Sequence, residues 1–293
     1  MLKIGAHVSI SGGIDKAIDR ARQIGAETIQ IFASSPQVWA FKPPTPSTTA
    51  TFVSKASSAA IDPVFLHAIY LVNLGTPAPD HLNKSIDALT KYMHVAAEIG
   101  ASGVIFHVGS HKGAGFAAVF DQVVKSIGMI IEASPNHVSL IIENSAGMGQ
   151  HICCSFREIG QVINAVGSPR VKVCLDTQHL FAAGHNIIDR DDLRRVMDEF
   201  DEQIRLSNLV AVHANDSKTP LSSGVDRHDN IGQGNIGLDG FRVIMGNEAF
   251  ADIPFLLEVP GNDGNGPDKA NIDVLKKLRH ELAHKAIDDQ SFA

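Results

Sequence analysis

The chain of 293 residues lacks the features of exported and membrane proteins. No apolar run is long enough to span a bilayer, and the start, Met1-Leu2-Lys3-Ile4-Gly5, is not the basic, apolar and small-residue pattern of a signal peptide. There are only three cysteines, two of them adjacent, and no Cys-x-x-Cys pair. This argues against a disulfide framework and against a thiolate zinc site. We therefore expect a soluble, cytoplasmic protein.

A basic charge excess and low-complexity linkers are also missing. The formal net charge is −7, whereas a nucleic-acid-binding protein usually carries a basic patch. The charge therefore counts against DNA binding unless bound cations offset it. No linker divides the sequence, and 44% hydrophobic residues suffice for one large core. We expect one domain over residues 1–293 with a short polar tail from about Asp288. Nothing signals oligomerisation, so we expect a monomer.

Short apolar runs alternate with longer amphipathic segments along the whole chain. Eight runs are typical of buried strands: Leu2–Val8, Thr28–Phe32, Pro63–Leu66, Gly103–Phe106, Val138–Ile142, Val171–Leu175, Leu209–Val212 and Pro254–Leu257. Helical patterns between them include Ile14–Ile24, Leu82–Ile99, Phe116–Glu132, Phe156–Val166, Asp191–Ile204 and Ile272–Ala286. The alternation predicts an α/β fold, a (β/α)8 TIM barrel, with an open doubly wound sheet as the alternative.

Six consecutive strand-like runs are followed directly by a residue of metal-ligand type. These residues are His67, His107, Glu143, Asp176, His213 and Glu258. Barrel active sites lie at the C-terminal ends of the strands, and adjacent strands are about 4.8 Å apart. A single polar residue at a strand end usually marks only the point where the chain meets solvent. Six in a row indicate a shared cluster, whose carboxylates would repel one another without cations.

Three further candidates lie in segments expected to be loops. His179 follows Asp176 by three residues. Asp226 and His228 are two residues apart in a segment expected to be extended, so their side chains point to the same side and could bind one ion. Mixed imidazole and carboxylate ligands suit zinc, with manganese or iron as alternatives. Two or three adjacent ions suit in-line attack on a phosphate. Three divalent ions would move the charge from −7 to about −1, which answers much of the objection to DNA binding.

Seven segments in fixed order resemble the endonuclease IV family of apurinic/apyrimidinic (AP) endonucleases. They are Gly5-Ala6-His7-Val8-Ser9, Tyr70-Leu71-Val72-Asn73-Leu74-Gly75, His107-Val108-Gly109-Ser110-His111, Glu143-Asn144-Ser145-Ala146-Gly147, Leu175-Asp176-Thr177-Gln178-His179, Asn215-Asp216-Ser217-Lys218 continuing to Asp226-Arg227-His228-Asp229-Asn230-Ile231-Gly232, and Phe255-Leu256-Leu257-Glu258. They span nearly the whole chain, so chance agreement is remote.

The resemblance implies a TIM barrel with three zinc ions at its mouth, for which manganese could substitute. By this analogy the first ion is held by His67, His107 and Glu143. Glu143 bridges to a second ion completed by Asp176, His213 and Glu258, and the third is held by His179, Asp226 and His228. Glu143 and Glu258 are then the catalytic carboxylates. The implied substrate is double-stranded DNA with abasic sites, cut on the 5′ side to leave a 3′ hydroxyl and a 5′ deoxyribose phosphate. Trimming of blocked 3′ ends is also implied.

The resemblance also implies a DNA-binding rim, where the chain departs from the family. Tyr70 and Leu71 match residues that fill the gap left by a flipped nucleotide, and Lys218 and Arg227 are expected to contact phosphates. Gln37 stands where the family often has an arginine that enters the DNA. Other departures are Gly224 for arginine, Val108 for proline and Gln178 for cysteine. The lost arginines concern DNA affinity and bending more than the chemistry.

Alternatives remain for two histidines and for the function. His7 ends the first strand and either bonds to a ligand residue or packs as an ordinary core histidine. His111 is expected to support a ligand or to be solvated.

A sugar isomerase or epimerase could use the same barrel with one or two ions, but it has no need of a third triad. A non-catalytic DNA-damage sensor is the other rival. The sequence favours a zinc-dependent DNA repair endonuclease.

Overall fold

The strands close into a parallel barrel. The computed structural model describes the backbone of residues 2–291 and the side chains of residues 2–284. The eight barrel strands are β1 (Ile4–His7), β2 (Ile29–Ile31), β3 (Val64–His67), β4 (Gly103–Phe106), β5 (Ser139–Glu143), β6 (Val171–Asp176), β7 (Leu209–His213) and β10 (Phe255–Leu257). Neighbours pair in the order β1-β10-β7-β6-β5-β4-β3-β2, which returns to β1. The prediction of a TIM barrel is confirmed, and the open sheet is wrong.

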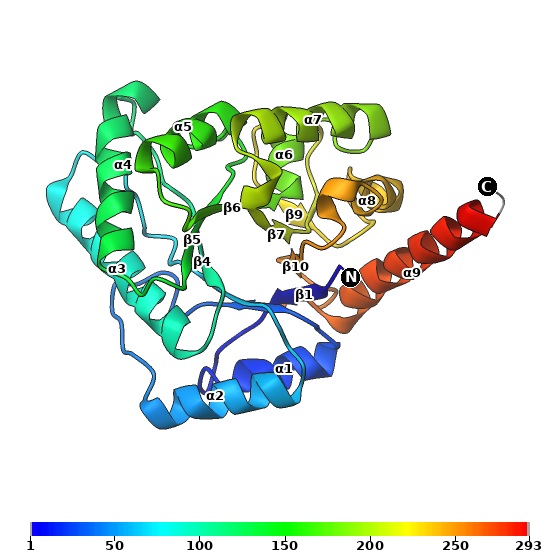
Figure 1. The fold of residues 1–293 in the computed structure, drawn as a ribbon, viewed down its shortest axis with the longest axis horizontal. Coiled ribbons are helices and arrows are strands. Elements are labelled where there is room, and N and C mark those ends of the chain that lie inside the picture. Colours follow the sequence, from blue (N-terminus) through cyan, green and yellow to red (C-terminus); the bar gives the residue numbers. More distant parts are fainter. Residues whose placement is uncertain (1, 292–293) are drawn as a thin grey trace.

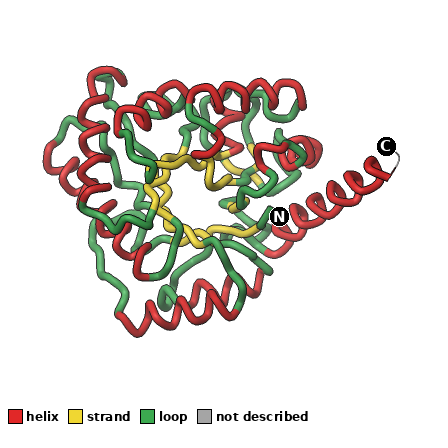
Figure 2. The backbone as a smooth tube through the Cα atoms, in the orientation of Figure 1, coloured by secondary structure: helices red, strands yellow, loops and turns green. Residues whose placement is uncertain are grey.

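Helices surround the ring of strands (Figures 1 and 2). They are α1 (Lys16–Ile24), α2 (Pro46–Ser58), α3 (Pro79–Glu98), α4 (Phe116–Glu132), α5 (Phe156–Val166), α6 (Thr177–Ala183), α7 (Arg190–Gln203), α8 (Gly237–Met245) and α9 (Lys269–Ser291), with short 3-10 turns at Leu206–Asn208 and Glu248–Phe250. The helix α2 begins at Pro46, the last residue of the proline-rich stretch 41–46. Thr45 caps it by accepting a hydrogen bond from the backbone of Thr48.

The polar tail expected from about Asp288 begins within a helix. α9 continues to Ser291, and the figures show it extending beyond the barrel (Figures 1 and 2). The tail expected from Asp288 is therefore helical up to Ser291, and residues 292–293 lie outside the described residues. In the described part of the chain, no helix is both long and apolar enough to cross a membrane.

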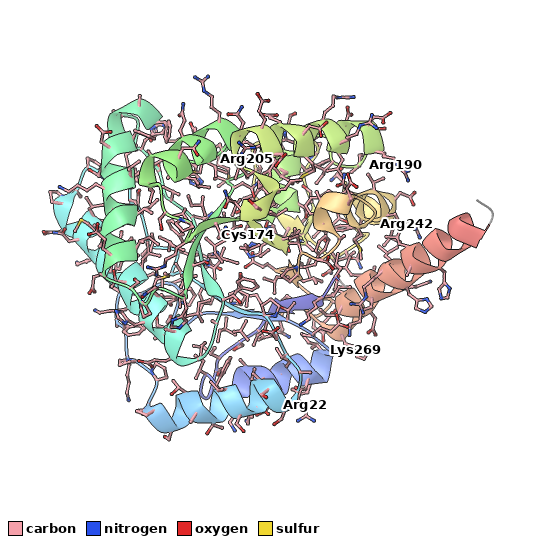
Figure 3. All side chains as sticks on the ribbon, in the orientation of Figure 1. Arg22, Cys174, Arg190, Arg205, Arg242 and Lys269 are labelled. Atoms are coloured by element: carbon pink, nitrogen blue, oxygen red, sulfur yellow. The ribbon has the colours of Figure 1, made fainter. Side chains whose placement is uncertain are left out.

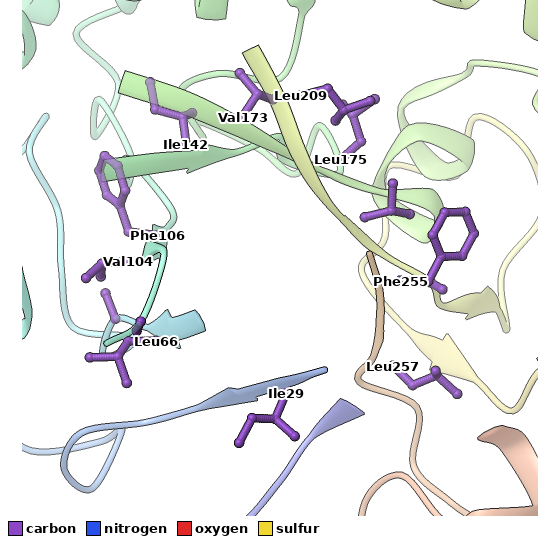
Figure 4. Packing of buried hydrophobic residues seen from close by; sticks show 14 of the residues in the cluster. Ile29, Leu66, Val104, Phe106, Ile142, Val173, Leu175, Leu209, Phe255 and Leu257 are labelled. Atoms are coloured by element: carbon purple, nitrogen blue, oxygen red, sulfur yellow. The ribbon is translucent and has the colours of Figure 1, made fainter. Parts of the chain in front are cut away.

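Two apolar layers fill the space on either side of the strands. The larger lies between strands and helices, and Figure 4 shows members such as Leu66, Phe106 and Leu175. The smaller lies inside the barrel and consists of Phe65, Ile105, Ile141, Cys174, Ala211 and Leu256. Figure 3 shows Cys174 among the strands, whereas the exposed basic side chains Arg22 and Arg242 lie on outer helices. Each strand is thus buried on both faces, which explains its nearly continuous apolar sequence.

Candidate metal centre

The six strand-end candidates form one layer at the barrel mouth. Each follows a residue of the inner apolar cluster by two positions, as His67 follows Phe65 and Glu258 follows Leu256. Because alternate residues of a strand face the same side, all six point toward the barrel axis. The layer is composed of His67, His107, Glu143, Asp176, His213 and Glu258. Closure of the barrel therefore brings together groups from six separate strands.

The first cluster consists of His67, His107 and Glu143. Their ligand atoms lie within 4.8 Å of one another. Oε2 of Glu143 is 3.1 Å from Nε2 of His67 and 3.4 Å from Nε2 of His107. The other ring nitrogen of His67 lies 2.8 Å from the carbonyl oxygen of Ala68 and donates to it. This bond keeps the proton on Nδ1 and leaves the lone pair of Nε2 facing the cluster.

The second cluster shares Glu143 with the first. It contains Glu143, Asp176, His213 and Glu258, again within 4.8 Å. Nδ1 of His213 is 3.0 Å from Oε1 of Glu143, 3.4 Å from Oε2 of Glu258 and 3.8 Å from Oδ2 of Asp176. The two oxygens of Glu143 therefore face different clusters. This is the arrangement that a bridging carboxylate requires.

The third cluster combines a helix and a loop. The expectation that His179 lies in a loop is wrong, because it lies in the first turn of α6. Oδ1 of Asp176 caps this helix by accepting from the backbone N–H of His179. Nε2 of His179 is 3.4 Å from Oδ2 of Asp226, and Nε2 of His228 is 3.3 Å from Oδ1 of the same residue. Asp176 also lies within 4.8 Å of both imidazoles, so it stands between the second and third clusters.

A buried carboxylate holds the loop that carries Asp226 and His228. The short strands β8 (Asp216–Ser217) and β9 (His228–Asp229) pair antiparallel at its base. The Asp216 side chain accepts hydrogen bonds from the backbone N–H groups of residues 217, 232, 234, 236 and 237. A Cβ at Gly234 would lie 2.4 Å from the carbonyl oxygen of Ser217, so only glycine fits there. The loop is therefore fixed by the sequence that follows β7.

The chemistry of these residues fits cations. Nε2 of His179 and Nε2 of His228 are buried and have no hydrogen-bond partner among the described residues, which is costly unless a ligand satisfies them. Burial raises the pKa of Glu143, but His107, His213 and His179 outweigh burial and hold that pKa well below its usual range. The carboxyl is therefore ionised. Oxygen and nitrogen lone pairs thus face one another at the mouth, and divalent ions would satisfy them.

Several side chains that hold the candidate ligands were not anticipated. Oδ1 of Asn144 accepts from the backbone of Asp176 at 2.7 Å, and Nδ2 of Asn215 donates to Oδ2 of Asp176 at 2.7 Å. Gln30, in the middle of β2, donates to Oε1 of Glu258 at 2.6 Å. The signal that could have revealed it is a polar residue between Ile29 and Ile31 on a predicted buried strand.

The structure also shows the contacts of His7 and His111, whose roles the sequence left undecided. Nδ1 of His7 lies 3.3 Å from Oε1 of Glu258, which favours contact with a ligand residue over ordinary packing. Nδ1 of His111 accepts from the backbone N–H groups of Gly113 and Gly115. His111 thus shapes its own loop and belongs to none of the three clusters.

The residues expected at a DNA-binding rim lie around this mouth. Tyr70 is 61% exposed, and its ring packs at 5.4 Å from Phe32 and 6.2 Å from His67. Its backbone N–H donates to the carbonyl oxygen of Pro36, which brings the exposed Gln37 beside it. Leu71 packs partly against the core. Lys218 and Arg227 are both exposed, and the backbone N–H of Lys218 donates to the carbonyl oxygen of Arg227.

Tyr70 separates two cavities at the mouth. One, of about 500 Å³, reaches from Tyr70 and Leu71 to His107 and Asp226. The other, of about 750 Å³, is lined by Tyr70, His7, Phe32, His228 and Glu258. Both therefore border the candidate ligands.

The fold and the site define the class to which the chain belongs. A family model described as a xylose isomerase-like TIM barrel matches residues 18–278, so the chain is a TIM barrel of that class. A probable endonuclease 4 of Trichlorobacter lovleyi is 37% identical over 277 residues, covering 94% of this chain and 99% of that protein. A probable endonuclease 4 of Geobacter sulfurreducens is 35% identical over the same length, with 94% of each chain covered.

Solved structures agree with these relatives. The endonuclease IV of Thermus thermophilus superposes with a TM-score of 0.84 at 30% identity, covering 95% of this chain and 99% of that one. The chain belongs to the endonuclease IV family of AP endonucleases. A D-tagatose 3-epimerase-like protein gives a TM-score of 0.71 at 13% identity, with both chains fully covered. That likeness shows a common fold only, so the isomerase alternative has less support.

Proposed function

We propose that the protein is a zinc-dependent DNA repair endonuclease that hydrolyses the phosphodiester bond 5′ to an abasic site in double-stranded DNA. The products would be a 3′ hydroxyl and a 5′ deoxyribose phosphate, and the enzyme would also trim blocked 3′ ends. The observation that carries this proposal is the set of three ligand clusters at one mouth. A sugar isomerase has no use for a third cluster of this kind, whereas phosphodiester hydrolysis does.

Each cluster offers a complete set of donors for one zinc ion. The first would be held by His67, His107 and Glu143, the second by Glu143, Asp176, His213 and Glu258, and the third by His179, Asp226 and His228. Imidazole and carboxylate donors suit zinc, and manganese is an acceptable substitute. Bound zinc would acidify water at neutral pH and neutralise the charge that develops on the phosphate.

Glu143 and Glu258 are the carboxylates assigned to catalysis. Glu143 is almost fully buried, and its oxygens divide between two clusters. It therefore fixes the separation of the first two subsites. Glu258 directs Oε2 toward Nδ1 of His213. Both carboxylates would hold the ions that orient and acidify the attacking water.

The rim would bind the damaged strand. Tyr70 and Leu71 would fill the space left when the abasic nucleotide turns toward the metal centre. Gln37, Lys218 and Arg227 would lie against the phosphate backbone. With its ions bound, the mouth would be positively charged although the chain itself carries −7. We further expect the chain to act as a cytoplasmic monomer with a single domain.

An incision assay tests the proposal directly. A duplex with one abasic site is incubated with zinc-loaded protein, and an otherwise identical duplex with an intact nucleotide serves as control. We expect cleavage only of the abasic strand, with a 3′ end that a DNA polymerase extends at once. Anomalous scattering at the zinc edge should place three ions at the mouth. Absence of incision with all three ions in place would contradict the proposed reaction.

A further inference from the structure

Gln30 completes the layer of side chains at the barrel mouth. Six strands contribute candidate ligands to this layer, β1 contributes His7, and β2 contributes Gln30. The adjacent residues Ile29 and Ile31 belong to the outer core, so the Gln30 side chain faces the barrel interior. It is fully buried, at 0% exposure. A buried amide at the level of the ligands needs hydrogen-bond partners.

The Gln30 amide contacts two candidate ligands of the second cluster. Oε1 lies 2.8 Å from Nε2 of His213, and Nε2 lies 2.6 Å from Oε1 of Glu258. The same Nε2 is 2.9 Å from Nδ1 of His7. One short side chain thus touches His213, Glu258 and His7 at once.

The chemistry of these contacts fixes the orientation of the amide. An ionised carboxylate has no proton to donate, so the atom that faces Glu258 must be the amide nitrogen. The amide oxygen then faces Nε2 of His213, which must carry the proton of that ring. It follows that Nδ1 of His213 keeps its lone pair, and this is the atom surrounded by Glu143, Glu258 and Asp176.

The Gln30 amide also determines which oxygen of the Glu258 carboxylate faces His213. Oε1 of Glu258 is occupied by the Gln30 amide and lies beside His7. Oε2 is then left to face Nδ1 of His213, at 3.4 Å. The amide therefore presents one atom of each residue to the space between them.

We infer that Gln30 is a positioning residue of the second metal subsite, where its amide selects Nδ1 of His213 and Oε2 of Glu258 as the ligand atoms. The inference rests on the proposed function, because it assumes that this subsite holds zinc. Partners of this kind typically change metal affinity by about 10–100-fold when removed.

Zinc binding by Gln30→Met tests the inference without an activity assay. Methionine has a similar length and suits a buried site, but it has no amide. Metal-depleted protein is titrated with zinc in competition with a chromogenic chelator. We expect one of the three ions of the wild type to bind about 10–100-fold more weakly, while the other two keep their affinity. Gln122→Met is the matched control, because the Gln122 amide donates to the carbonyl oxygens of Leu74 and Thr76 and touches no candidate ligand.

A second measurement uses the wild-type chain and so does not depend on the folding of a variant. In zinc-loaded protein labelled with ¹⁵N-histidine, the proton of the His213 ring should lie on Nε2. A proton on Nδ1 overturns the inference, as does wild-type affinity for all three ions in Gln30→Met. A wild-type chain that binds no zinc overturns the proposed function, and the inference with it. The two failures are therefore distinguishable.

Discussion

At the scale of single residues, the site depends on Glu143. Its two oxygens face two different clusters, and its neighbours hold its pKa well below the usual range despite burial. Glu143 is the last residue of β5 and contacts His67, His213 and His179. Neutralising Glu143 would therefore affect two subsites at once.

We expect Glu143→Gln to lower the incision rate by at least about a thousandfold, since loss of a single preorganised electrostatic group already costs about 10²–10³-fold. The shape of the side chain is preserved, so the circular dichroism spectrum should not change. Steady-state incision of an abasic duplex measures the effect. Glu132→Gln, an exposed change on α4, is the control and should retain full activity. Retention of a tenth of the activity by Glu143→Gln would contradict the assigned role.

At the scale of elements, two loops form the proposed DNA-binding rim. The segment after β2 carries Gln37, the segment after β3 carries Tyr70, and the bond from the Tyr70 N–H to the Pro36 carbonyl joins them. A cation at position 37 would thus stand beside the exposed Tyr70 ring. The chain has glutamine there, so this part of the rim is neutral.

We expect Gln37→Arg to tighten DNA binding and to steepen its salt dependence. Each added phosphate contact should increase the slope of log K against log salt by about 0.9 in magnitude. Fluorescence anisotropy with an abasic duplex at several salt concentrations measures both quantities. Gln23→Arg near the C-terminal end of α1 is the matched control, because it adds the same charge at the opposite end of the barrel. An unchanged slope for Gln37→Arg would contradict its place in the rim.

The other end of the barrel depends on contacts between α9 and the start of the chain. Glu27 accepts hydrogen bonds from Arg279 at 2.7 and 2.9 Å and from the backbone N–H of Ile4, and Lys276 lies 3.3 Å away. Partial burial raises the pKa of Glu27, but these donors outweigh it and lower the pKa from 4.5 to about 2. The ionised form is therefore favoured by folding.

The stability that Glu27 contributes should depend on pH. Because its folded-state pKa is depressed, the contribution is full above pH 4.5 and is lost as the pH falls toward about 2. The side chain is 31% exposed, so screening reduces the effect to about 1–2 kcal/mol. Urea unfolding of metal-free Glu27→Gln and wild type should differ by this amount at pH 7, and the difference should shrink as the pH falls from 4.5 toward about 2. Glu281→Gln, which breaks the exposed pair between α9 and Arg242 of α8, should change stability by less than about 0.5 kcal/mol.

The local sequence predicted most of the helices and strands but missed a few. The helices at Phe116–Glu132 and Phe156–Val166 have the boundaries expected from apolar periodicity. The helix α6 escaped detection, because it has only seven residues and begins through the cap that Asp176 provides. A cap of this kind depends on where a side chain points, and apolar periodicity does not report that.

At the scale of the whole molecule, bound metal ions would change both the net charge of the protein and the stability of its fold. Three divalent ions would change the formal charge from −7 to about −1 and would concentrate the added charge at one end of the barrel. Without them, ionised carboxylates of three clusters would face one another in a largely buried layer. The folded chain should therefore be stabilised by its metal.

We expect chelation to lower the melting temperature and to abolish incision slowly, since buried zinc with several ligands leaves reluctantly. Zinc present at a thousandfold excess over its Kd contributes about 4 kcal/mol for each site, or roughly 10 °C per site for a chain of this size. Differential scanning calorimetry before and after chelation, with elemental analysis of the same samples, measures the change. Added zinc should restore both properties. An unchanged melting temperature in metal-depleted protein would show that the clusters do not stabilise the fold.

The sequence by itself determined the barrel and the identity of its strand-end residues, because buried strands and ligand side chains both follow from local patterns. Which residues share a cluster does not follow from these local patterns; only the family resemblance implied the groups and the bridging role of Glu143. The dual contacts of Glu143, the place of Asp176 between two clusters, and the Gln30 amide against His213 and Glu258 were decided only by closure of the barrel. Closure sets the distances between side chains on different strands, and no local pattern contains those distances.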